Sequence, residues 1–413
     1  MSALIRLAKD HGATVSGSDQ HDSPVLDRLR REGYRVYAGV DPSFAERADL
    51  TVYTGAIPLT HPEIACARRL MERSEFLALC ARSFPTVVAV AGTHGKTTCC
   101  AFLTSIMKEA GLPFTAHVGG VLQDVGSGYF RQGYDILVTE ACEYRAHFLS
   151  LKPTVGVISS VEYDHPDYYR TPQELREAFG RFASNCDALV ATKEVQTCIG
   201  EHECKCIYDD MSIREIDRES NKWEYRDNCG DMEVTMPVWG DFNAYDAGLA
   251  IRVARLLGVG YEEIRRGIAA YRGAARRQQR LGTLHGAPVL TDYAHHPTEI
   301  ASLLSAAKER YGRLCVVFQP HTYSRTRGLL DEFATCFEGA DTLLIIPTYA
   351  ARETGDDGIL DRLIERITVE EKRLLSKQKA VEYLLDSTRK YDAYLLVGAG
   401  DVDTIAAKLP LGD

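Results

Sequence analysis

Short apolar runs rich in β-branched residues alternate with longer stretches of helical periodicity along the whole chain. This alternation is typical of parallel sheets wrapped by helices. It falls into three stretches, which we interpret as an N-terminal domain over residues 1–85, a central domain over 86–275 and a C-terminal domain over 276–413. The pattern therefore predicts an α/β protein of three domains, each built on a largely parallel sheet with flanking helices.

The first stretch opens on an amphipathic helix that ends at Gly12, followed by a strand over 14–16, a turn over 17–19 and a strand that leads into 54–57. Rossmann-like domains open instead with a strand and a Gly-rich turn. Loss of such a strand would expose apolar surface and unpaired backbone groups. We therefore expect a truncated Rossmann-like domain, explained by a misassigned start or a fragment; a chain that lacks the segment is the alternative.

The two later stretches predict buried strands that alternate with helices. In the second stretch we expect strands over residues 86–90, 135–139, 155–158 and 188–190. In the third we expect strands over residues 288–291, 314–318, 342–346 and 394–397. A long helix is predicted over 243–257, another over 297–311 with proline at its first position, and a small β-rich insertion over 201–237.

Composition and charge narrow the class of protein. Hydrophobic residues make up 45% and charged residues 26% of the 413 residues, as in folded soluble proteins. No run approaches about 18 apolar residues, and Arg6 and Lys9 lie inside the first helix, so we expect no membrane span, no signal peptide and a cytoplasmic location. A net charge of −10 argues against nucleic-acid binding. We expect a monomer or a weak dimer.

The 12 cysteines are scattered over a chain without a secretion signal, so we expect reduced thiols. One cluster contains Cys198, His202, Cys204 and Cys206. Zinc binding is the alternative interpretation of this cluster, but the paired spacing typical of zinc sites is missing. Incidental thiols are therefore the expectation.

The sharpest chemical signal is a Gly-rich turn between a buried strand and a helix. It reads Gly92-Thr93-His94-Gly95-Lys96-Thr97-Thr98. The N–H groups of such a turn cradle phosphates, while Lys96 reaches the terminal phosphates and the Thr97 hydroxyl ligates Mg²⁺. The general motif has a glycine where Val90 stands, so a Gly-rich connector is the alternative. The strand and helix on either side favour an ATP site with Mg²⁺.

A carboxylate and a histidine follow the next two strands. Glu140 comes after the strand over 135–139, and His165 comes after the strand over 155–158. Sites in parallel sheets lie beyond the carboxyl ends of the strands. Glu140 is therefore a candidate Mg²⁺ ligand, with His165 at the same edge. Because Mg²⁺ prefers oxygen, a surface loop histidine is the alternative for His165.

Five motifs occur in an order that points to a family. They are the turn over 92–98, Glu140-Ala141-Cys142-Glu143-Tyr144, Asp164-His165-Pro166-Asp167, Asp292-Tyr293-Ala294-His295-His296-Pro297-Thr298-Glu299 and Phe318-Gln319-Pro320-His321-Thr322-Tyr323-Ser324-Arg325-Thr326-Arg327. Together they closely resemble the Mur ligases that join L-alanine to UDP-N-acetylmuramate, over essentially the whole chain. The last two motifs separate this type from most other Mur ligases.

The resemblance implies an N-terminal Rossmann-like domain for the UDP-sugar, a central P-loop ATPase-like domain and a C-terminal Rossmann-like domain that closes over ATP and the amino acid. It implies that ATP phosphorylates the lactyl carboxylate of UDP-N-acetylmuramate. The amine of L-alanine then attacks the acyl phosphate to give an amide, ADP and phosphate. The implied cofactors are ATP and Mg²⁺, and the implied partners are the two substrates.

The resemblance also assigns roles to residues. Catalytic roles fall to Lys96, Glu140, His165, His295 and Arg325. ATP would contact Gly92, Thr93, His94, Gly95, Lys96, Thr97, Thr98, Asn243 and Asp292. The UDP-sugar and alanine would contact Ser18, Asp19, Glu143, His295, His321, Arg325 and Arg327. Mg²⁺ would bind Thr97, Glu140 and His165.

Simpler interpretations stand beside these roles. Asn243 at a helix start is also an ordinary N-cap, and Phe242 stands where the family has a histidine. His295 and His296 could be polar loop residues, and the arginines could be solvated surface groups. The basic run over 276–280 is interpreted as a hinge with a phosphate contact as its further role.

Two other functions remain open. A recycling ligase that attaches a murein tripeptide to the same UDP-sugar is the nearer alternative, and the motif over 318–326 favours alanine over it. A non-catalytic nucleotide-binding homologue is the other. The Gly-rich turn that is missing from the N-terminal domain suggests such a homologue. The presence of Lys96, Thr97, Glu140 and His165 argues against it.

Overall fold

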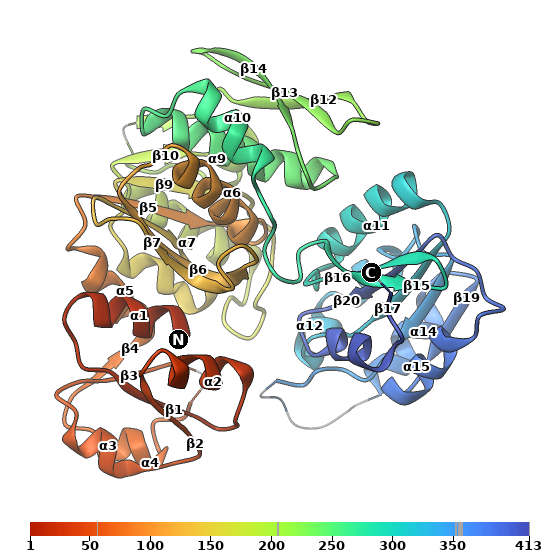
Figure 1. Ribbon diagram of the computed structural model, residues 1–413, viewed down its shortest axis with the longest axis horizontal. Helices are drawn as coiled ribbons and strands as arrows, with labels where there is room; N and C mark the ends of the chain where they lie inside the picture. The colour runs from red at the N-terminus through yellow and green to blue at the C-terminus, as the bar shows by residue number, and fades with distance from the viewer. Residues whose placement is uncertain (56, 205, 352, 354–357, 413) are drawn as a thin grey trace.

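The computed structural model describes residues 1–412 except 56, 205, 352 and 354–357. Three α/β bodies follow one another along the chain, and both outer bodies adjoin the central one (Figure 1). The predicted α/β class is confirmed. Within the described residues, no helix combines the length and the apolar character needed to cross a membrane.

The N-terminal body contains two separate pairs of parallel strands. The pairs are β1 (Ser16–Asp19) with β2 (Arg35–Ala38), and β3 (Thr51–Tyr53) with β4 (Leu70–Glu72). The helices are α1 (Ser2–Asp10), α2 (Pro24–Arg31), α3 (Pro42–Arg47), α4 (Pro62–Ala65) and α5 (Arg73–Ala81). Helix α1 buries Leu4 and Leu7 in the core that it shares with the central body. The body is thus anchored through its first helix.

The predicted turn over 17–19 is wrong. These residues continue β1 and pair with 36–38 of β2. Glycine, serine and aspartate favour turns locally, but the hydrogen bonds of the parallel ladder override that preference here.

The central body holds a seven-stranded sheet in the order β11-β10-β9-β5-β8-β6-β7, in which only β7 is antiparallel to its neighbour. The strands are β5 (Thr86–Ala91), β6 (Phe114–Leu122), β7 (Ser127–Arg131), β8 (Ile136–Glu140), β9 (Val155–Ile158), β10 (Ala188–Val190) and β11 (Cys206–Tyr208). The helical segments are α6 (Lys96–Glu109), the 3₁₀ segment η1 (Tyr144–Ser150), α7 (Pro172–Ser184), α8 (Lys193–Ile199), α9 (Asp241–Leu256) and α10 (Tyr261–Ala269). Strand β5 is buried on both faces, with Val88 and Val90 in one core cluster and Val87 and Ala89 in the other.

The predicted β-rich insertion is smaller than expected. Three antiparallel strands form it, namely β12 (Ser212–Asp217), β13 (Lys222–Asp227) and β14 (Gly230–Thr235). Strand β11, which the prediction included, pairs instead with β10 at the edge of the main sheet. Trp223, Tyr225 and Val234 face the central core, so the insertion covers the end of the body above α9 (Figure 1).

The C-terminal body has a six-stranded sheet in the order β15-β16-β20-β17-β18-β19, in which only β15 is antiparallel. The strands are β15 (Gln279–Leu284), β16 (Ala287–Asp292), β17 (Leu314–Phe318), β18 (Thr342–Ile345), β19 (Glu371–Leu374) and β20 (Ala393–Val397). The helical segments are α11 (Pro297–Tyr311), α12 (Tyr323–Gly328), α13 (Leu330–Thr335), α14 (Ile359–Arg366), α15 (Lys377–Leu385) and η2 (Val402–Lys408). The four predicted strands are present, while β15 and β19 were not expected.

Candidate active site

The phosphate loop joins β5 to α6 at the carboxyl edge of the central sheet. Gly92 has a φ of 145° and Gly95, directly before α6, has a φ of 82°, conformations that favour glycine. A Cβ at Gly92 would collide with Ser159. Thr93 Oγ1 donates to Glu162 O at 2.9 Å, which fixes the loop to the segment after β9. Helix α6 carries no side-chain cap at its N-terminus, so the arrangement fits an anion such as phosphate.

Lys96, the first residue of α6, lies back over this loop. Its Nζ contacts Gly92 O and lies 3.2 Å from Thr93 O and 2.8 Å from Glu143 Oε2. Burial alone would lower the pKa of Lys96, but Glu143, together with Cys142 and Glu140, outweighs burial and raises it. Burial would raise the pKa of Glu143, but Lys96 and His165 lower it. The ammonium is therefore charged, and a bound phosphate would compete with Glu143 for it.

Thr97 and Glu140 meet beside the loop. Thr97 Oγ1 donates to Glu140 Oε1 at 2.8 Å, and the same oxygen accepts from Gly119 N at 2.8 Å. His165 lies next to Glu143 instead, with 3.3 Å between its Nε2 and Glu143 Oε1. Two of the three predicted Mg²⁺ ligands are thus in direct contact, and His165 approaches them through the carboxylate that holds Lys96.

Arg325 of α12 crosses from the C-terminal body to the central one. Its Nε and Nη2 donate to the two carboxylate oxygens of Asp164 at 3.0 and 3.1 Å. Both side chains are buried, with exposed fractions of 8% and 4%. Burial would raise the pKa of Asp164, but Arg325 holds it far below its usual range. His321 Nδ1 lies 3.1 Å from Arg325 Nη1, so two predicted substrate residues share one cluster.

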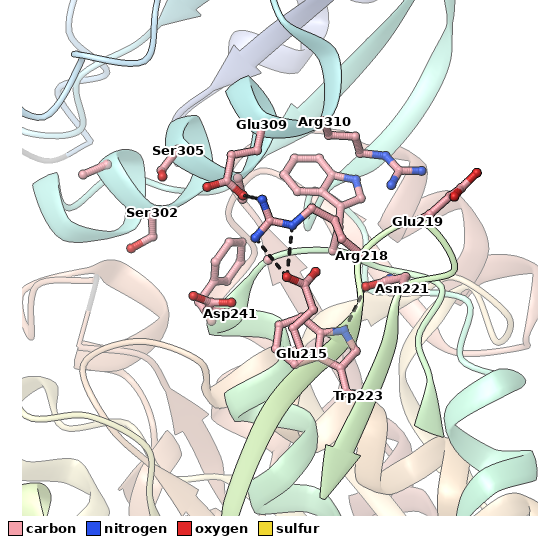
Figure 2. A pocket seen from close by; sticks show the side chains of 15 residues that line it. Glu215, Arg218, Glu219, Asn221, Trp223, Asp241, Ser302, Ser305, Glu309 and Arg310 are labelled. Carbon is pink, nitrogen blue, oxygen red and sulfur yellow. Dashed lines mark hydrogen bonds and ion pairs between the residues drawn. The ribbon is translucent and has the colours of Figure 1, made fainter. Parts of the chain in front are cut away.

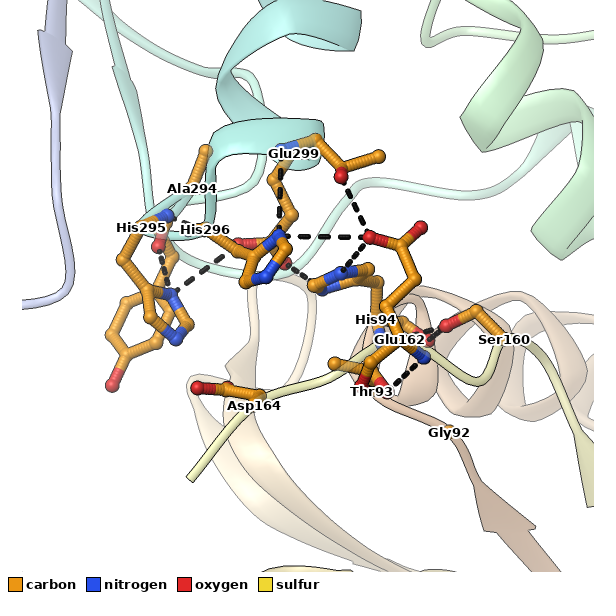
Figure 3. Close-up of polar contacts among 12 residues, drawn as sticks. Gly92, Thr93, His94, Ser160, Glu162, Asp164, Ala294, His295, His296 and Glu299 are labelled. Atoms are coloured by element: carbon orange, nitrogen blue, oxygen red, sulfur yellow. Dashed lines mark hydrogen bonds and ion pairs between the residues drawn. The ribbon is translucent and has the colours of Figure 1, made fainter. Parts of the chain in front are cut away.

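His94 of the phosphate loop lies between two carboxylates (Figure 3). Its Nε2 is 3.4 Å from Glu162 Oε2, and its Nδ1 is 3.2 Å from Glu299 Oε1. Burial lowers the pKa of His94, but Glu299 and Glu162 outweigh burial and raise it to about 9. His295 lies 3.4 Å from Glu299 on the other side, and burial lowers its pKa to about 3. At neutral pH, His94 is charged and His295 is neutral.

Asn243 lies on α9, where that helix meets the C-terminal body. Its amide donates to Trp239 O at 2.9 Å, and its side chain is buried. Helix α9 begins at Asp241 after Gly240, so Asn243 lies inside the first turn and its N-cap interpretation is wrong. The neighbouring Phe242 packs against the core of the C-terminal body.

Asp292, at the end of β16, organises the junction between the central and C-terminal bodies. Its carboxylate accepts from Gln278 N and Ala294 N, each at 2.8 Å. Burial raises the pKa of Asp292, and these hydrogen bonds oppose the shift. Arg276 donates to Gly400 O at 2.7 Å, so the basic run packs against the turn after β20.

Three predicted substrate residues lie outside these clusters. Ser18 and Asp19 lie on β1 in the N-terminal body, where the Ser18 hydroxyl donates to Glu63 Oε2 at 2.6 Å. Arg327 is exposed on α12. The structure thus collects the phosphate-loop residues and the C-terminal histidines, but not these three.

Glu162, Asp164 and Glu299 received no role from the sequence. Each lies inside or beside one of the five sequence motifs, so its place near the site could be predicted. Their partners across the domain boundary are far away in the chain. The available signal was that acidic residues follow β9, while His94 precedes α6 and α12 carries Arg325 and Arg327.

A cavity of about 600 Å³ lies apart from the phosphate loop, between the insertion, the start of α9 and α11 (Figure 2). Trp223, Trp239 and Phe242 supply its aromatic walls. Arg218 also lines the cavity and pairs with Glu309 Oε2 at 2.9 Å. The cavity therefore borders the C-terminal body without including residues 92–98.

The cysteine cluster does not form a ligand set within the described residues. Cys204 Sγ lies 3.5 Å from Cys206 O, and Cys198 Sγ lies 3.8 Å from Val161 O. All 12 cysteines are free thiols. Among the described residues, the single group with metal-ligand spacing is His94, Glu162 and His296.

Three family models match consecutive parts of the chain. The Mur ligase family catalytic domain matches residues 1–85, the Mur ligase middle domain matches 90–254, and the Mur ligase glutamate ligase domain matches 276–400. Together they span all three bodies.

Relatives and solved structures agree with these matches. A UDP-N-acetylmuramate–L-alanine ligase of Clostridium botulinum is 34% identical over 99% of this chain and 94% of its own length, and one of Clostridium beijerinckii gives the same values. The UDP-N-acetylmuramate-alanine ligase structure from Thermotoga maritima has a TM-score of 0.79 at 24% identity, covering 99% of this chain and 95% of its own. A murein peptide ligase from Psychrobacter arcticus has a TM-score of 0.76 at 22% identity, with the same coverage.

Proposed function

The chain belongs to the Mur ligase family, and from that membership we propose that it joins L-alanine to the lactyl carboxylate of UDP-N-acetylmuramate in peptidoglycan precursor synthesis. It is an ATP-dependent, amide-bond-forming ligase. The observation that carries the substrate assignment is 34–35% identity, over 97–99% of the chain, to relatives named as L-alanine ligases.

The central phosphate loop supports ATP as the phosphoryl donor. Lys96 would leave Glu143 and place its charge on the terminal phosphates, where phosphoryl transfer needs cations. Thr97 and Glu140 would hold Mg²⁺, because a hydroxyl and a carboxylate oxygen 2.8 Å apart offer the hard ligands that this ion prefers. When bound, the ion would neutralise charge on the phosphate oxygens. His165 is the third proposed ligand.

The residues after β9, β16 and β17 support the acyl-transfer half of the reaction. The lactyl carboxylate would attack the γ-phosphorus, and the alanine amine would then displace phosphate from the acyl carbon. His295 is neutral and lies beside the carboxylate of Glu299, so its ring could accept a hydrogen bond from that amine, while its pKa of about 3 makes it a poor proton acceptor. Arg325, with His321, would release Asp164 and bind the alanine carboxylate in its place.

The remaining assignments follow from the domain order. We place the UDP-sugar on residues 1–85, with Ser18 and Asp19 among its contacts, ATP on 86–275 and the amino acid on 276–413. Asn243 and Asp292 would contact the nucleoside of ATP at the junction of the last two domains. A reaction that consumes ATP supports a cytoplasmic location, and a monomer or weak dimer remains our proposal for the assembly.

The murein tripeptide ligase is the second candidate. The fold alone does not separate the two, because solved structures of both kinds match the chain with TM-scores of 0.79 and 0.76. The more similar relatives favour L-alanine. A non-catalytic homologue is disfavoured by the assembled set of Lys96, Thr97 and Glu140.

The test compares amino donors in one assay. Phosphate release from ATP and Mg²⁺ is measured with UDP-N-acetylmuramate plus either L-alanine or the murein tripeptide. The proposal requires release that depends on both the UDP-sugar and L-alanine. Release with the tripeptide alone would support the second candidate, and bound ATP without any release would indicate the non-catalytic homologue.

A further inference from the structure

Two histidines and a carboxylate from two domains converge beside the phosphate loop (Figure 3). His94 precedes α6, Glu162 follows β9, and His296 caps α11. One ligand atom from each lies within 4.8 Å of the other two. Glu162 Oε2 is the shared point, at 3.4 Å from His94 Nε2 and 3.6 Å from His296 Nδ1.

These two separations match the edges of a metal coordination shell. A tetrahedral ion with bonds of about 2.0–2.2 Å to nitrogen and oxygen spaces its ligands roughly 3.3–3.6 Å apart. Ordinary N–H···O hydrogen bonds are shorter, about 2.9–3.0 Å between the heavy atoms. These two separations therefore fit ligands around an ion as well as long hydrogen bonds, and the two histidine nitrogens lie within 4.8 Å of each other.

The outer nitrogen of each ring already faces an acceptor. His94 Nδ1 lies 3.2 Å from Glu299 Oε1, and His296 Nε2 lies 3.3 Å from Tyr163 O. Metal binding would displace the Nε2 proton of the charged His94 ring. With a proton left on each outer nitrogen, His94 Nε2 and His296 Nδ1 are the ring atoms that face Glu162. Metal-binding histidines are held in this way by a carboxylate or a carbonyl behind the ring.

The supporting groups are themselves fixed. Glu299 accepts from His295 N at 3.0 Å and from His296 N at 3.3 Å. Thr298 Oγ1 donates to Glu162 Oε2 at 2.6 Å, which orients that carboxylate. Thr298 N donates to His296 Nδ1, the nitrogen that would bind the ion, but this hydrogen bond is long at 3.4 Å and competes weakly.

We propose that His94, Glu162 and His296 bind a divalent transition-metal ion of the Zn²⁺ class, which bridges the central and C-terminal domains in the nucleotide-free protein. Two imidazoles and one carboxylate suit Zn²⁺, whereas Mg²⁺ takes oxygen ligands. The site is separate from the proposed Mg²⁺ pair of Thr97 and Glu140. Glu162 is 36% exposed, which leaves a fourth coordination position open to solvent.

The ion would fasten a phosphate-loop residue to α11 and so hinder the loop from receiving ATP. Zn²⁺ should therefore inhibit the ligase in competition with ATP. This inhibition rests on the proposed function, whereas binding of the ion does not. The two are measured separately for that reason.

The binding test uses Co²⁺ as a spectroscopic probe on the full chain without nucleotide. We expect visible absorption of a nitrogen- and oxygen-ligated site without thiolate-to-cobalt charge transfer. Glu299→Gln should weaken Co²⁺ binding roughly 10–100-fold, because Glu299 supports the ligand His94 without binding the ion itself. Glu162→Gln and His296→Ala remove proposed ligands and should weaken binding further. His202→Ala and Cys206→Ser are matched controls in the cysteine cluster and should bind as the unaltered chain does.

Wild-type affinity in Glu162→Gln and His296→Ala would overturn the proposal, as would charge transfer that Cys206→Ser removes. Circular dichroism establishes that each variant is folded. Glu162→Gln replaces one carboxylate oxygen with an amide nitrogen on a side chain that is 36% exposed. Lost Co²⁺ binding in this variant would therefore indicate loss of a metal ligand. A chain that binds Co²⁺ but releases no phosphate would contradict the proposed function and leave the metal site standing.

Discussion

The molecule has two clusters of charged side chains, one at the phosphate loop and one between the central and C-terminal domains. Different contacts hold the two clusters in place. Lys96, Thr97, Glu140 and Glu143 all lie at one edge of the central sheet, after β5 and β8. Asp164–Arg325 and His94–Glu299 join residues of the central domain to residues of the C-terminal one. The first geometry is fixed by a single folded body, whereas the second exists only while two bodies are docked.

This difference separates the expected effects of mutation. A change in the phosphate-loop cluster removes a group that the reaction uses and leaves the docking of the domains intact. A change in the interdomain cluster alters an equilibrium between docked and separated domains. Inter-domain contacts of this kind permit relative motion unless they are large and apolar.

The largest effect is expected from Lys96→Ala. Loss of one preorganised cation at a phosphoryl-transfer site lowers turnover by roughly 10²–10³-fold or more. Steady-state phosphate release measures it, and small-angle scattering should show unchanged docking. Lys193→Ala, an exposed lysine at the start of α8, is the matched control. Unchanged turnover in Lys96→Ala would refute the assignment of the phosphate loop.

The next effect concerns the buried pair between domains. Removing one partner of such a pair costs about 3–5 kcal/mol, and here the loss should fall on docking, because Asp164 and Arg325 belong to different bodies. Arg325→Ala and Asp164→Asn should each expand the nucleotide-free protein in small-angle scattering. The double variant should expand it little more than either single one. Additive effects of the two substitutions would show that they do not act as a pair.

A pH effect of intermediate size is expected at His94. The pKa of His94 in the folded chain, about 9, exceeds the unfolded value. The contribution of His94 to the free energy of unfolding is therefore fully present below pH ~6.5 and lost as the pH rises through 9. The side chain is 15% exposed, and the shift corresponds to on the order of 3 kcal/mol. With a chelator present, the melting temperature should fall across this window in the unaltered chain and change less in His94→Gln. Parallel curves would contradict the charged state of His94.

The smallest effect is expected from an exposed pair between domains. Arg218 of the insertion region and Glu309 of α11 lie 2.9 Å apart, but their side chains are 65% and 52% exposed. Such pairs contribute about 0–1 kcal/mol. Arg218→Ala should leave the scattering profile and the melting temperature nearly unchanged. A shift as large as that of Arg325→Ala would mean that burial does not decide the strength of these contacts.

The sequence predicted Lys96, Thr97 and Glu140 at one site because their positions are local or follow from sheet topology, but it did not predict that Glu143 pairs with Lys96. The strand over 155–158 and the helix over 297–311 were predicted with the bounds that the structure shows. Thr97 and Glu140 were expected together, since parallel strands bring their carboxyl ends to one edge. Apolar periodicity was sufficient for these elements.

The interdomain contacts could not be predicted from the same patterns. Arg325 meets Asp164 across 161 residues, and no periodicity relates the two. His94 was expected at phosphate, but its pairing with Glu299 depends on how two domains dock. β15 was missed because Gly282, at a φ of 148°, interrupts a short amphipathic run. Local propensity also misjudged residues 17–19, where sheet pairing prevailed.

The most direct test of the account follows an oxygen atom. UDP-N-acetylmuramate labelled with ¹⁸O in the lactyl carboxylate is incubated with the chain, ATP, Mg²⁺ and L-alanine, and the released phosphate is analysed by mass spectrometry. Attack of that carboxylate on the γ-phosphorus, followed by displacement by the amine, predicts one ¹⁸O in each phosphate formed with product. Amide product accompanied by unlabelled phosphate would contradict activation of the carboxylate at the phosphate loop.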